Sequence, residues 1–391
     1  MNRHFLRDIA DIQTGPFGSQ LHKEDYVDIG TPIVTVEHLG NRVFTEQNLP
    51  KVSDEDKARL SKYVLKEGDI VFSRVGSVDR CSYVDAAHDG WMFSGRCLRV
   101  RPNTEVDPLY LYYFFCLEDT KQFVRNIAVG ATMPSINTKL LGEVEVAYPS
   151  QTEQQKIVAL LSALDDKIEI NQKINDNLYA QAKAIFAQRF IGIETIPDGW
   201  KKGNLLDIAN YLNGLAMQKF RPRDDEVGLP VLKIKELRQG SCDVSSELCS
   251  PSIKPEYIVH DGDVIFSWSG SLLVDIWCGG TCGLNQHLFK VTSETYDQWF
   301  YYLWTAHHLE RFIAIAADKA TTMGHIKRGE LEKAEVLIPS EKDYKEISSL
   351  MNPLFNLIIA NRIEARKLTE LRDELLPKLM SGEIDVSEVS V

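Results

Sequence analysis

The residues of this 391-residue chain that could do chemistry are hydrogen-bonding side chains in segments punctuated by glycine. In the first half they are Gln13, Thr14, Ser19, Gln20, Arg74, Ser77, Arg80, Arg96, Thr132, Ser135 and Lys139. In the second half they are Asn213, Gln218, Lys219, Arg221, Lys233, Lys235, Trp268, Ser269, Ser271, Asn285, Gln286, His287, Thr322, His325 and Lys327. Arg can donate to guanine edges, Asn and Gln can pair with adenine, and Ser and Thr are more permissive. On exposed loops, this set would be suited to reading the edges of DNA bases.

Motifs for catalysis or metal binding are missing from the sequence. We find no glycine-rich fingerprint for a dinucleotide or S-adenosylmethionine, no adenine-methylation motif and no GxxxxGK[ST] phosphate loop. Asp165-Asp166-Lys167 resembles the end of a nuclease DxK site, but it lies in a heptad pattern that predicts a solvated helix face. Cys278, Cys282 and His287 lack the tighter four-ligand pattern of structural zinc, so reduced thiols are expected. We therefore expect a non-enzymatic chain with no metal or cofactor of its own.

The elements that must position these side chains occur twice. Tyr63–Ser77 reads YVLKEGDIVFSRVGS, and Tyr257–Ser271, about 190 residues later, reads YIVHDGDVIFSWSGS. Glu145–Ser150 recurs in the same way as Glu335–Ser340. A repeat this long is a duplicated domain, because solenoid units have periods of roughly 20–50 residues. The chain therefore predicts two similar globular units that engage two similar targets.

The two copies differ at the polar positions. By sequence alignment Arg74 faces Trp268, Arg80 faces Val274, and Arg96 faces Gln286 or a neighbour. Trp268 could pack on a thymine methyl group or lie in the core, which is the commoner fate of Trp.

Ordinary explanations stay open for the other polar residues. A single Arg is as often solvated or ion-paired as bound to a ligand, and Asn285-Gln286-His287 could be an amide-rich turn. Lys233 and Lys235 alternate with apolar residues, which predicts a strand with both amines on one face, either solvated or along DNA.

A heptad helix follows each globular part. Apolar residues and one Asn recur at spacings of three and four over about four heptads, which is typical of a coiled coil. The predicted seam consists of Ile157, Leu161, Leu164, Ile168, Asn171 and Leu178 in the first helix, and of Ile347, Met351, Leu354, Ile358, Asn361 and Leu368 in the second. Since each helix follows an equivalent domain, we expect an antiparallel intramolecular pair with a pseudo-twofold axis. Two separate amphipathic helices, each covering its own domain, are the alternative.

The helix ends and length are also predictable. The first helix should stop near Phe190 before Gly192, and Pro353 predicts a break or fresh start in the second, because proline lacks an amide donor. A helix of about 35 residues spans on the order of 50 Å at ~1.5 Å per residue. This exceeds one turn of B-DNA, so the helices could act as a ruler.

The globular parts combine strands and helices. Apolar runs predict short strands at Ile70–Phe72, Leu98–Val100, Val144–Val146, Val264–Phe266 and Leu288–Val291. Leu-, Tyr- and Phe-rich stretches predict amphipathic helices at Asp107–Phe123 and Tyr296–Phe312. The expected fold class is α+β, with a strongly bent sheet and helices in each domain. The predicted boundaries are 1–149, a spacer helix at 150–191, a second domain at 192–339, and a second spacer helix at 340–391.

The charge is acidic throughout. The net charge is −12; residues 1–150 carry 17 Lys and Arg against 21 Asp and Glu, and residues 196–340 carry 15 against 19. Any phosphate contacts must therefore come from local clusters. No apolar run approaches the ~18–20 residues that cross a bilayer, and the first residues lack the apolar core of a signal peptide, so a cytoplasmic location without membrane contact is expected.

The motifs together resemble a known family. GDIVFSRVGS and GDVIFSWSGS occupy equivalent places, Pro149-Ser150 and Pro339-Ser340 each lead into a heptad helix, and the tail Leu376–Ile384 reads LPKLMSGEI. In this order, twice over, they resemble the specificity subunit of a Type I restriction-modification system. The resemblance covers essentially the whole chain.

The resemblance implies a division of labour. Each globular part would be a target-recognition domain that reads one half of a split, asymmetric site in double-stranded DNA. The helices would set the unread gap and dock two methyltransferase (M) subunits, and motor-nuclease (R) subunits would complete the complex. S-adenosylmethionine would be bound by the methyltransferase partner for adenine methylation.

Two other functions stay open. One is an acidic two-domain coiled-coil adaptor that binds protein without DNA specificity, which the charge of −12 favours. The feature that distinguishes it is whether the polar loops of the two copies converge on one concave face, separated by the length of the helices. The other is a restriction-system module with catalysis of its own, which the missing motifs disfavour.

Overall fold

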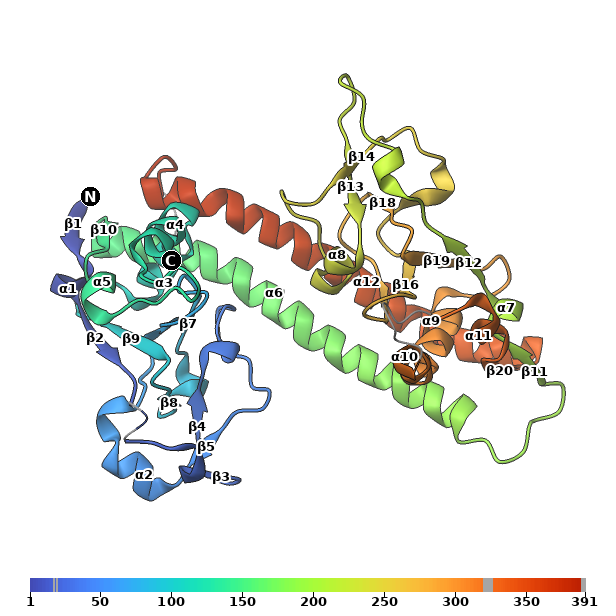
Figure 1. The fold of residues 1–391 in the computed structure, drawn as a ribbon, viewed down its shortest axis with the longest axis horizontal. Helices are drawn as coiled ribbons and strands as arrows, with labels where there is room; N and C mark the ends of the chain where they lie inside the picture. The colour runs from blue at the N-terminus through green and yellow to red at the C-terminus, as the bar shows by residue number, and fades with distance from the viewer. Residues whose placement is uncertain (17, 19, 319–325, 388–391) are drawn as a thin grey trace. The chain divides into compact units, whose positions relative to one another are not determined.

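The structure is a computed structural model that describes residues 1–16, 18, 20–318 and 326–387 (Figure 1). The chain forms two compact units, Met1–Leu164 with Leu371–Val391, and Asp165–Glu370. Unit 1 and unit 2 each combine a globular domain with parts of both long helices. The boundaries predicted from sequence instead treated each helix as a separate part.

A four-stranded antiparallel sheet is the centre of unit 1. Its order is β2-β9-β6-β7, with strands Ala10–Thr14, Cys97–Pro102, Ile70–Ser73 and Cys81–Tyr83. Ile70 and Phe72 of β6 belong to one hydrophobic core and Val71 to a second, as the two-residue period of a strand requires. The whole strand is buried because apolar layers cover both faces.

Two helices cover the Phe72 side of this sheet. They are α3 (Pro108–Cys116) and α4 (Glu118–Ile127). The rings of Phe72 and Phe115 meet edge-to-face at 4.7 Å. The single helix predicted over Asp107–Phe123 is wrong, because the backbone at Leu117 turns to ψ 135° between the two helices.

Smaller elements complete unit 1. A second sheet has the order β3-β5-β4-β8, with strands Tyr26–Val27, Lys51–Val52, Thr31–Val34 and Met92–Phe93. β1 (Asn2–Phe5) pairs with β10 (Glu145–Tyr148). The short helices are α1 (Leu6–Ile9), α2 (Asp54–Arg59) and α5 (Thr138–Leu141).

Unit 2 repeats this plan. Its central sheet has the order β12-β19-β16-β17, with strands Asn210–Asn213, Leu288–Thr292, Val264–Ser267 and Leu273–Ile276. Val264 and Phe266 of β16 again enter one core and Ile265 enters another. The helix predicted over Tyr296–Phe312 is two helices, α9 (Gln298–His307) and α10 (Leu309–Asp318).

The remaining elements of unit 2 also have counterparts in unit 1. A small sheet has the order β14-β13-β18-β15, with strands Leu248–Cys249, Leu229–Leu232, Cys282–Leu284 and Ile258–Val259. β11 (Lys201–Asn204) pairs with β20 (Glu335–Ile338). The short helices are α7 (Leu205–Ile208), α8 (Ile234–Gln239) and α11 (Arg328–Glu332). The two domains are therefore both α+β, as predicted, and their central sheets have the same strand order.

The long helices differ from the prediction in one detail. α6 (Gln151–Phe186) ends in a π-helical turn, Ala187–Ile191, before Gly192, as expected. α12 (Glu341–Ser381) runs without a break through Pro353. The expected break is wrong: Pro353 lies on the exposed side, while Met351 and Phe355 on either side are buried in the core of unit 2 and keep the helix continuous.

The two long helices pair antiparallel within unit 2. Asn361 Nδ2 donates to Asn175 Oδ1 (3.0 Å), and Asn175 Nδ2 donates to the carbonyl of Ile358 (3.3 Å). Asn171 Nδ2 donates to Glu364 Oε2 (2.7 Å). As the residue numbers increase along α6, the numbers of their partners on α12 decrease, so the two helices run antiparallel. The predicted antiparallel coiled coil is confirmed.

Both predicted seam asparagines are buried, as are Ile347, Met351 and Ile358. Leu164, Ile168, Leu178, Leu354 and Leu368 are half-buried. In unit 1, Ile157 and Leu161 of α6 share a core with Leu376 and Leu379 of α12. The prediction that Asp165 lies on a solvated face is wrong, since this carboxylate is only 4 % exposed.

Among the described residues, no helix is both long and apolar enough to cross a membrane.

Candidate nucleic-acid interface

Two arginines face each other where β6 and β9 continue beyond the central sheet of unit 1. Ser73 pairs with Cys97, and one residue further the amide of Arg74 donates to the carbonyl of Arg96 (2.8 Å). Residues opposite each other on antiparallel strands share a face. Arg74 is half-buried and its Nη1 donates to the carbonyl of Gly95 (3.1 Å). Arg96 is exposed, and its side chain has no hydrogen-bond or ion-pair partner among the described residues.

A hairpin lies against these strand ends. Val129 and Ser135 exchange two backbone hydrogen bonds (2.9 and 2.8 Å), and the amide of Ile136 donates to the carbonyl of Arg74 (2.9 Å). Thr132 is exposed near the tip. Thr14 is placed on the neighbouring strand β2, opposite Leu98 of β9. The structure thus brings Thr14, Arg74, Arg96, Thr132 and Ser135 to one end of the sheet.

Sequence reasoning missed the apolar part of this hairpin. Val129 is 63 % exposed and Met133 is 57 % exposed. Gly130 has φ 113°, a conformation that favours glycine and tightens the turn. The sequence signal for this hairpin was Gly130, which lies between Val129 and Met133, two apolar residues that are not part of a hydrophobic core.

The same end of the sheet in unit 2 carries different side chains. Here the amide of Trp268 donates to the carbonyl of His287 (3.4 Å), so Trp268 and His287 occupy the places of Arg74 and Arg96. The sequence matched Arg96 with Gln286 or a neighbour, and the structure identifies the neighbour, His287. The alignment of Arg80 with Val274 is off by one residue, because Cys81 pairs with Phe72 as Val274 pairs with Phe266.

Hydrogen bonds join the polar groups at this end of unit 2. Trp268 Nε1 donates to Asn213 Oδ1 (2.9 Å). Ser269 Oγ and His287 Nδ1 lie 3.0 Å apart, and Gln286 Nε2 lies 3.4 Å from His287 Nε2. The amide of Ile326 donates to the carbonyl of Trp268 (3.1 Å), which repeats the bond between Ile136 and Arg74 in unit 1.

Two predicted residues of this group are not on the surface. Asn285 is buried, and its Oδ1 accepts from the amide of His287 (3.2 Å). Ser269 is also buried. The expectation of exposed side chains is wrong for both, because both hold the turn that presents His287. Ser19, Thr322 and His325 lie outside the described residues.

Three predicted cations in unit 2 are bound to carboxylates instead. Glu247 accepts from Lys233 Nζ (2.5 Å) and lies 3.2 Å from Arg221 Nη1. Lys235 Nζ lies 3.3 Å from Asp243 Oδ2. Hydrogen bonds from Ser245, Gln239 and Lys235 hold the pKa of Asp243 well below its usual range. Lys233 and Lys235 are not on a strand: β13 ends at Leu232, and Lys233 precedes α8.

Several predicted residues lie apart from the strand ends. Arg80 donates to the carbonyl of Leu39. Gln20 accepts from the hydroxyl of Tyr63 (2.7 Å), and Gln13 is half-buried on β2 opposite Arg99. The remaining ones, which are exposed on turns or at helix starts, are Ser77, Lys139, Gln218, Lys219, Ser271 and Lys327.

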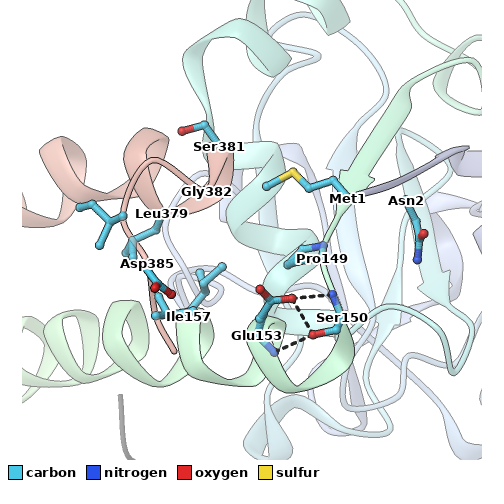
Figure 2. Close-up of a pocket in the computed structure, with 12 residues that line it drawn as sticks. Met1, Asn2, Pro149, Ser150, Glu153, Ile157, Leu379, Ser381, Gly382 and Asp385 are labelled. Atoms are coloured by element: carbon cyan, nitrogen blue, oxygen red, sulfur yellow. Dashed lines mark hydrogen bonds between the residues drawn. The ribbon is translucent and has the colours of Figure 1, made fainter. Parts of the chain in front are cut away.

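Figure 2 shows a cleft in another part of unit 1, where β1, the start of α6 and the segment after α12 meet. Its cavity has a volume of about 510 Å³. Ser150 donates to Glu153 through its hydroxyl (2.6 Å) and its amide (3.1 Å), and these bonds lower the pKa of Glu153. The polar lining therefore serves to cap α6.

In the part of the chain that the structure describes, no group of three or more His, Cys, Asp or Glu side chains could hold a metal ion. The chemistry available at the strand ends is hydrogen bonding and apolar contact.

Comparison with known proteins agrees with this architecture. The sequence matches the family described as "Type I restriction modification DNA specificity domain" twice, over residues 2–180 and 197–371. It is 27 % identical to the Type I restriction enzyme MjaIX specificity subunit of Methanocaldococcus jannaschii, over 98 % of this chain and 93 % of that protein. It is 21 % identical to the HindI specificity subunit of Haemophilus influenzae, over 84 % and 89 %.

A solved structure shares the fold. The crystal structure of the S subunit of a Type I restriction-modification system from M. genitalium superposes with a TM-score of 0.58 at 16 % identity, covering 97 % of this chain and 95 % of that one. The two matched segments cover both globular domains and most of each long helix. The chain therefore belongs to the family of Type I restriction-modification DNA specificity subunits.

Proposed function

We propose that this chain is the non-catalytic DNA-recognition subunit of a Type I restriction-modification complex, in which each globular domain reads one half of a bipartite, asymmetric site. One observation carries the proposal. The two domains keep the same backbone hydrogen bonds at the end of the central sheet but present Arg74 and Arg96 in one and Trp268 and His287 in the other. Two domains that have the same backbone arrangement but different side chains at matching positions are suited to reading two different DNA sequences.

The long helices would set the gap between the half-sites and dock two methyltransferase subunits. In unit 2, Ile170 and Ile174 of α6 and Leu350 and Leu357 of α12 are exposed although they lie on paired helices. Exposed apolar side chains on an otherwise polar helix favour a protein partner. The S-adenosylmethionine for adenine methylation would then be bound by that partner, and motor-nuclease subunits would join the full complex.

The acidic charge sets a condition on the proposal. With a net charge of −12, the chain alone has few phosphate contacts to offer. We expect the methyltransferase subunits to supply much of the backbone neutralisation, so the lone chain should bind DNA weakly and lose affinity steeply with salt. Tight, specific binding by the lone chain at physiological salt would contradict this account.

The test is methylome sequencing of cells that express this chain with its methyltransferase partner, against cells that lack the chain. The expected result is a new bipartite motif with a fixed gap, methylated on both strands. An absence of new methylation, with the partner shown to be active, would favour the protein-binding adaptor instead.

The gap has its own test. Insertion of one heptad between Leu161 and Ala182, with a matching heptad in α12, should lengthen the unread gap by about three base pairs, since seven residues add ~10 Å. The two half-sites should stay the same. An unchanged gap would show that the helices do not set it.

A further inference from the structure

We infer that the two domains read chemically different half-sites: domain 1 reads guanine through Arg74 and Arg96, and domain 2 reads A·T pairs through Trp268 and Gln286. This inference rests on the proposed function and deepens it. It concerns only the ends of the two central sheets.

The strand ends in domain 1 carry two positive charges at matching positions. Arg74 and Arg96 lie directly opposite each other on antiparallel strand ends, joined by a backbone bond of 2.8 Å. Like charges in this position destabilise a strand pair. The exposed guanidinium of Arg96 has no carboxylate partner among the described residues. Such a pair is stabilised when a ligand supplies hydrogen-bond acceptors between the two side chains.

The geometry of Arg74 favours a DNA base over a phosphate as the hydrogen-bond acceptor. Arg74 is half-buried, and its bond to the carbonyl of Gly95 (3.1 Å) fixes the direction of the guanidinium. A guanidinium held in one direction matches the N7 and O6 acceptors of guanine, which lie in one plane at a fixed spacing. The exposed apolar side chains of Val129 and Met133 beside it are suited to bases and sugars and not to phosphates.

The matching strand ends in domain 2 carry side chains of a different chemical kind. The indole N–H of Trp268 is engaged by Asn213 Oδ1 (2.9 Å), and its half-buried ring packs on Phe289 (5.7 Å) in the core of unit 2. The exposed part of the side chain therefore offers apolar ring atoms and no free N–H donor. An apolar surface in the groove favours the methyl group of thymine. Next to it the half-buried amide of Gln286 carries the donor and acceptor that match adenine. Neither matched position in this domain carries a guanidinium.

The experiment uses the full chain with its methyltransferase partner and compares methylomes of Arg96→Ala and Arg96→Lys with the parent. We expect discrimination at one guanine of one half-site to fall between roughly 5- and 150-fold, with the other half-site unchanged. Compared with Arg96→Ala, Arg96→Lys should recover the overall level of methylation more fully than the discrimination for guanine. An ammonium group keeps the positive charge but cannot form the bidentate hydrogen bonds of a guanidinium. Arg3→Ala is the matched control: it removes an exposed cation of the same unit on β1 and should leave both half-sites unchanged.

A second measurement does not depend on the variants folding. Duplex substrates for the unaltered complex carry 7-deazaguanine, which lacks the N7 acceptor, in one half-site or the other. We expect methylation to fall when the analogue is in one half only. Trp268→Ala or Gln286→Ala should relax the opposite half, which assigns the halves to the domains.

Three outcomes would overturn the inference. One is uniform weakening by Arg96→Ala at all sequences with a salt slope lower by about 1, which is the signature of a phosphate contact. Another is equal sensitivity of both halves to 7-deazaguanine. The third is a bipartite motif whose guanines do not respond to Arg96. A complete lack of sequence-specific methylation would instead contradict the proposed function itself.

Discussion

The two units attach the same domain to the long helices in different ways. In unit 2, Arg362 of α12 donates two hydrogen bonds to the carboxylate of Asp275 (2.8 and 2.7 Å), and Arg366 donates to Asp261 (2.8 Å). The residues about 190 positions earlier are Gln172 and Asp176, both exposed, which do not repeat these bonds. Among the described residues, the matched positions of α6 thus do not repeat the ion-pair clamp that α12 makes in unit 2.

Unit 1 holds its domain with a buried side-chain amide, Gln154, in the first turn of α6. Gln154 Oε1 accepts from the amide of Asp107 (2.8 Å), and Gln154 Nε2 donates to the carbonyls of Glu105 and Pro149. In unit 2 the equivalent amide, that of Asp297, donates to the hydroxyl of Tyr344 (2.5 Å). Both residues satisfy the same backbone donor at the start of the domain helix. The comparison teaches that a duplicated fold preserves the backbone bond and exchanges the side chain that makes it.

Replacement of Tyr344 by glutamine, the residue that unit 1 has at this place, should have the largest effect on stability. Tyr344→Gln should lower the free energy of unfolding of unit 2 by about 3 kcal/mol, because it leaves a cavity beside aromatic rings as well as a weaker acceptor. The rings of Tyr296, Trp299 and Phe300 lie 5.4, 5.9 and 5.5 Å from that of Tyr344. Urea unfolding followed by hydrogen exchange in α9 measures the effect. Tyr344→Phe is the control and should cost about 1 kcal/mol, for the lost hydroxyl, which accepts from the amide of Asp297 and donates to its carboxylate (3.1 Å). Equal losses for the two variants would contradict the packing argument.

Removal of the clamp is the next test. Arg362→Ala leaves Asp275 without its guanidinium partner, and both side chains are less than one-third exposed. We expect a loss of about 2 kcal/mol in unit 2. The double exchange Arg362→Asp with Asp275→Arg should recover part of this loss, whereas Gln172→Ala at the matching place in α6 should change stability little. No recovery by the exchange would show that packing of the Arg stem, and not the ion pair, holds the domain.

Acid should weaken the starts of both long helices. Hydrogen bonds from Ser340 and Trp200 lower the pKa of Asp343 from its ordinary value of 3.8, and hydrogen bonds from Ser150 lower that of Glu153 from 4.5. Because the folded-state pKa is the lower one, this stabilisation is present above the unfolded-state pKa and is lost as pH falls through the folded-state pKa. Urea midpoints measured from pH 6 downward should therefore decline below about pH 4. Glu153→Gln and Asp343→Asn should make the decline shallower, and unchanged slopes would contradict the assignment.

The smallest effect is expected at a surface pair that both units share. Arg3 lies 3.7 Å from Glu145 across β1 and β10, and Lys202 lies 2.6 Å from Glu335 across β11 and β20. All four side chains are more than half exposed, so Arg3→Ala and Lys202→Ala should each change stability by less than about 0.5 kcal/mol. Thermal unfolding measures this. A larger loss at the shorter pair would show that its geometry outweighs solvent screening.

Much of the fold was predictable from local signals. The Gly-Asp turns followed by an apolar run located β6 and β16, since Gly68 and Gly262 adopt positive φ before a buried strand. The heptads located α6 and α12 and their antiparallel pairing. The helix breaks at Leu117 and His308 were not predictable, because neither residue is the Gly or Pro that commonly marks a helix end.

The candidate site was predictable only in part. Arg74 and Trp268 were matched correctly because they follow the repeated strand directly. Arg96 was matched only to Gln286 or a neighbour, because the segment between the two strands differs in length between the copies. Backbone hydrogen bonds in the folded protein identify that neighbour as His287. Lys233 and Lys235 were misassigned since a short alternation fits a strand and a helix start equally well.

The composition of unit 1 has a consequence for the order of folding during synthesis. Its core includes Leu376, Leu379, Met380 and Val386, which leave the ribosome after all of unit 2, whereas unit 2 is one continuous segment, Asp165–Glu370. Domains generally fold as their residues emerge, first the N-terminal one. Here unit 2 can complete its core while unit 1 still waits for its last helix. The N-terminal domain is therefore the one exposed longest to proteases and chaperones, and truncation of the C-terminal residues should destabilise the beginning of the protein.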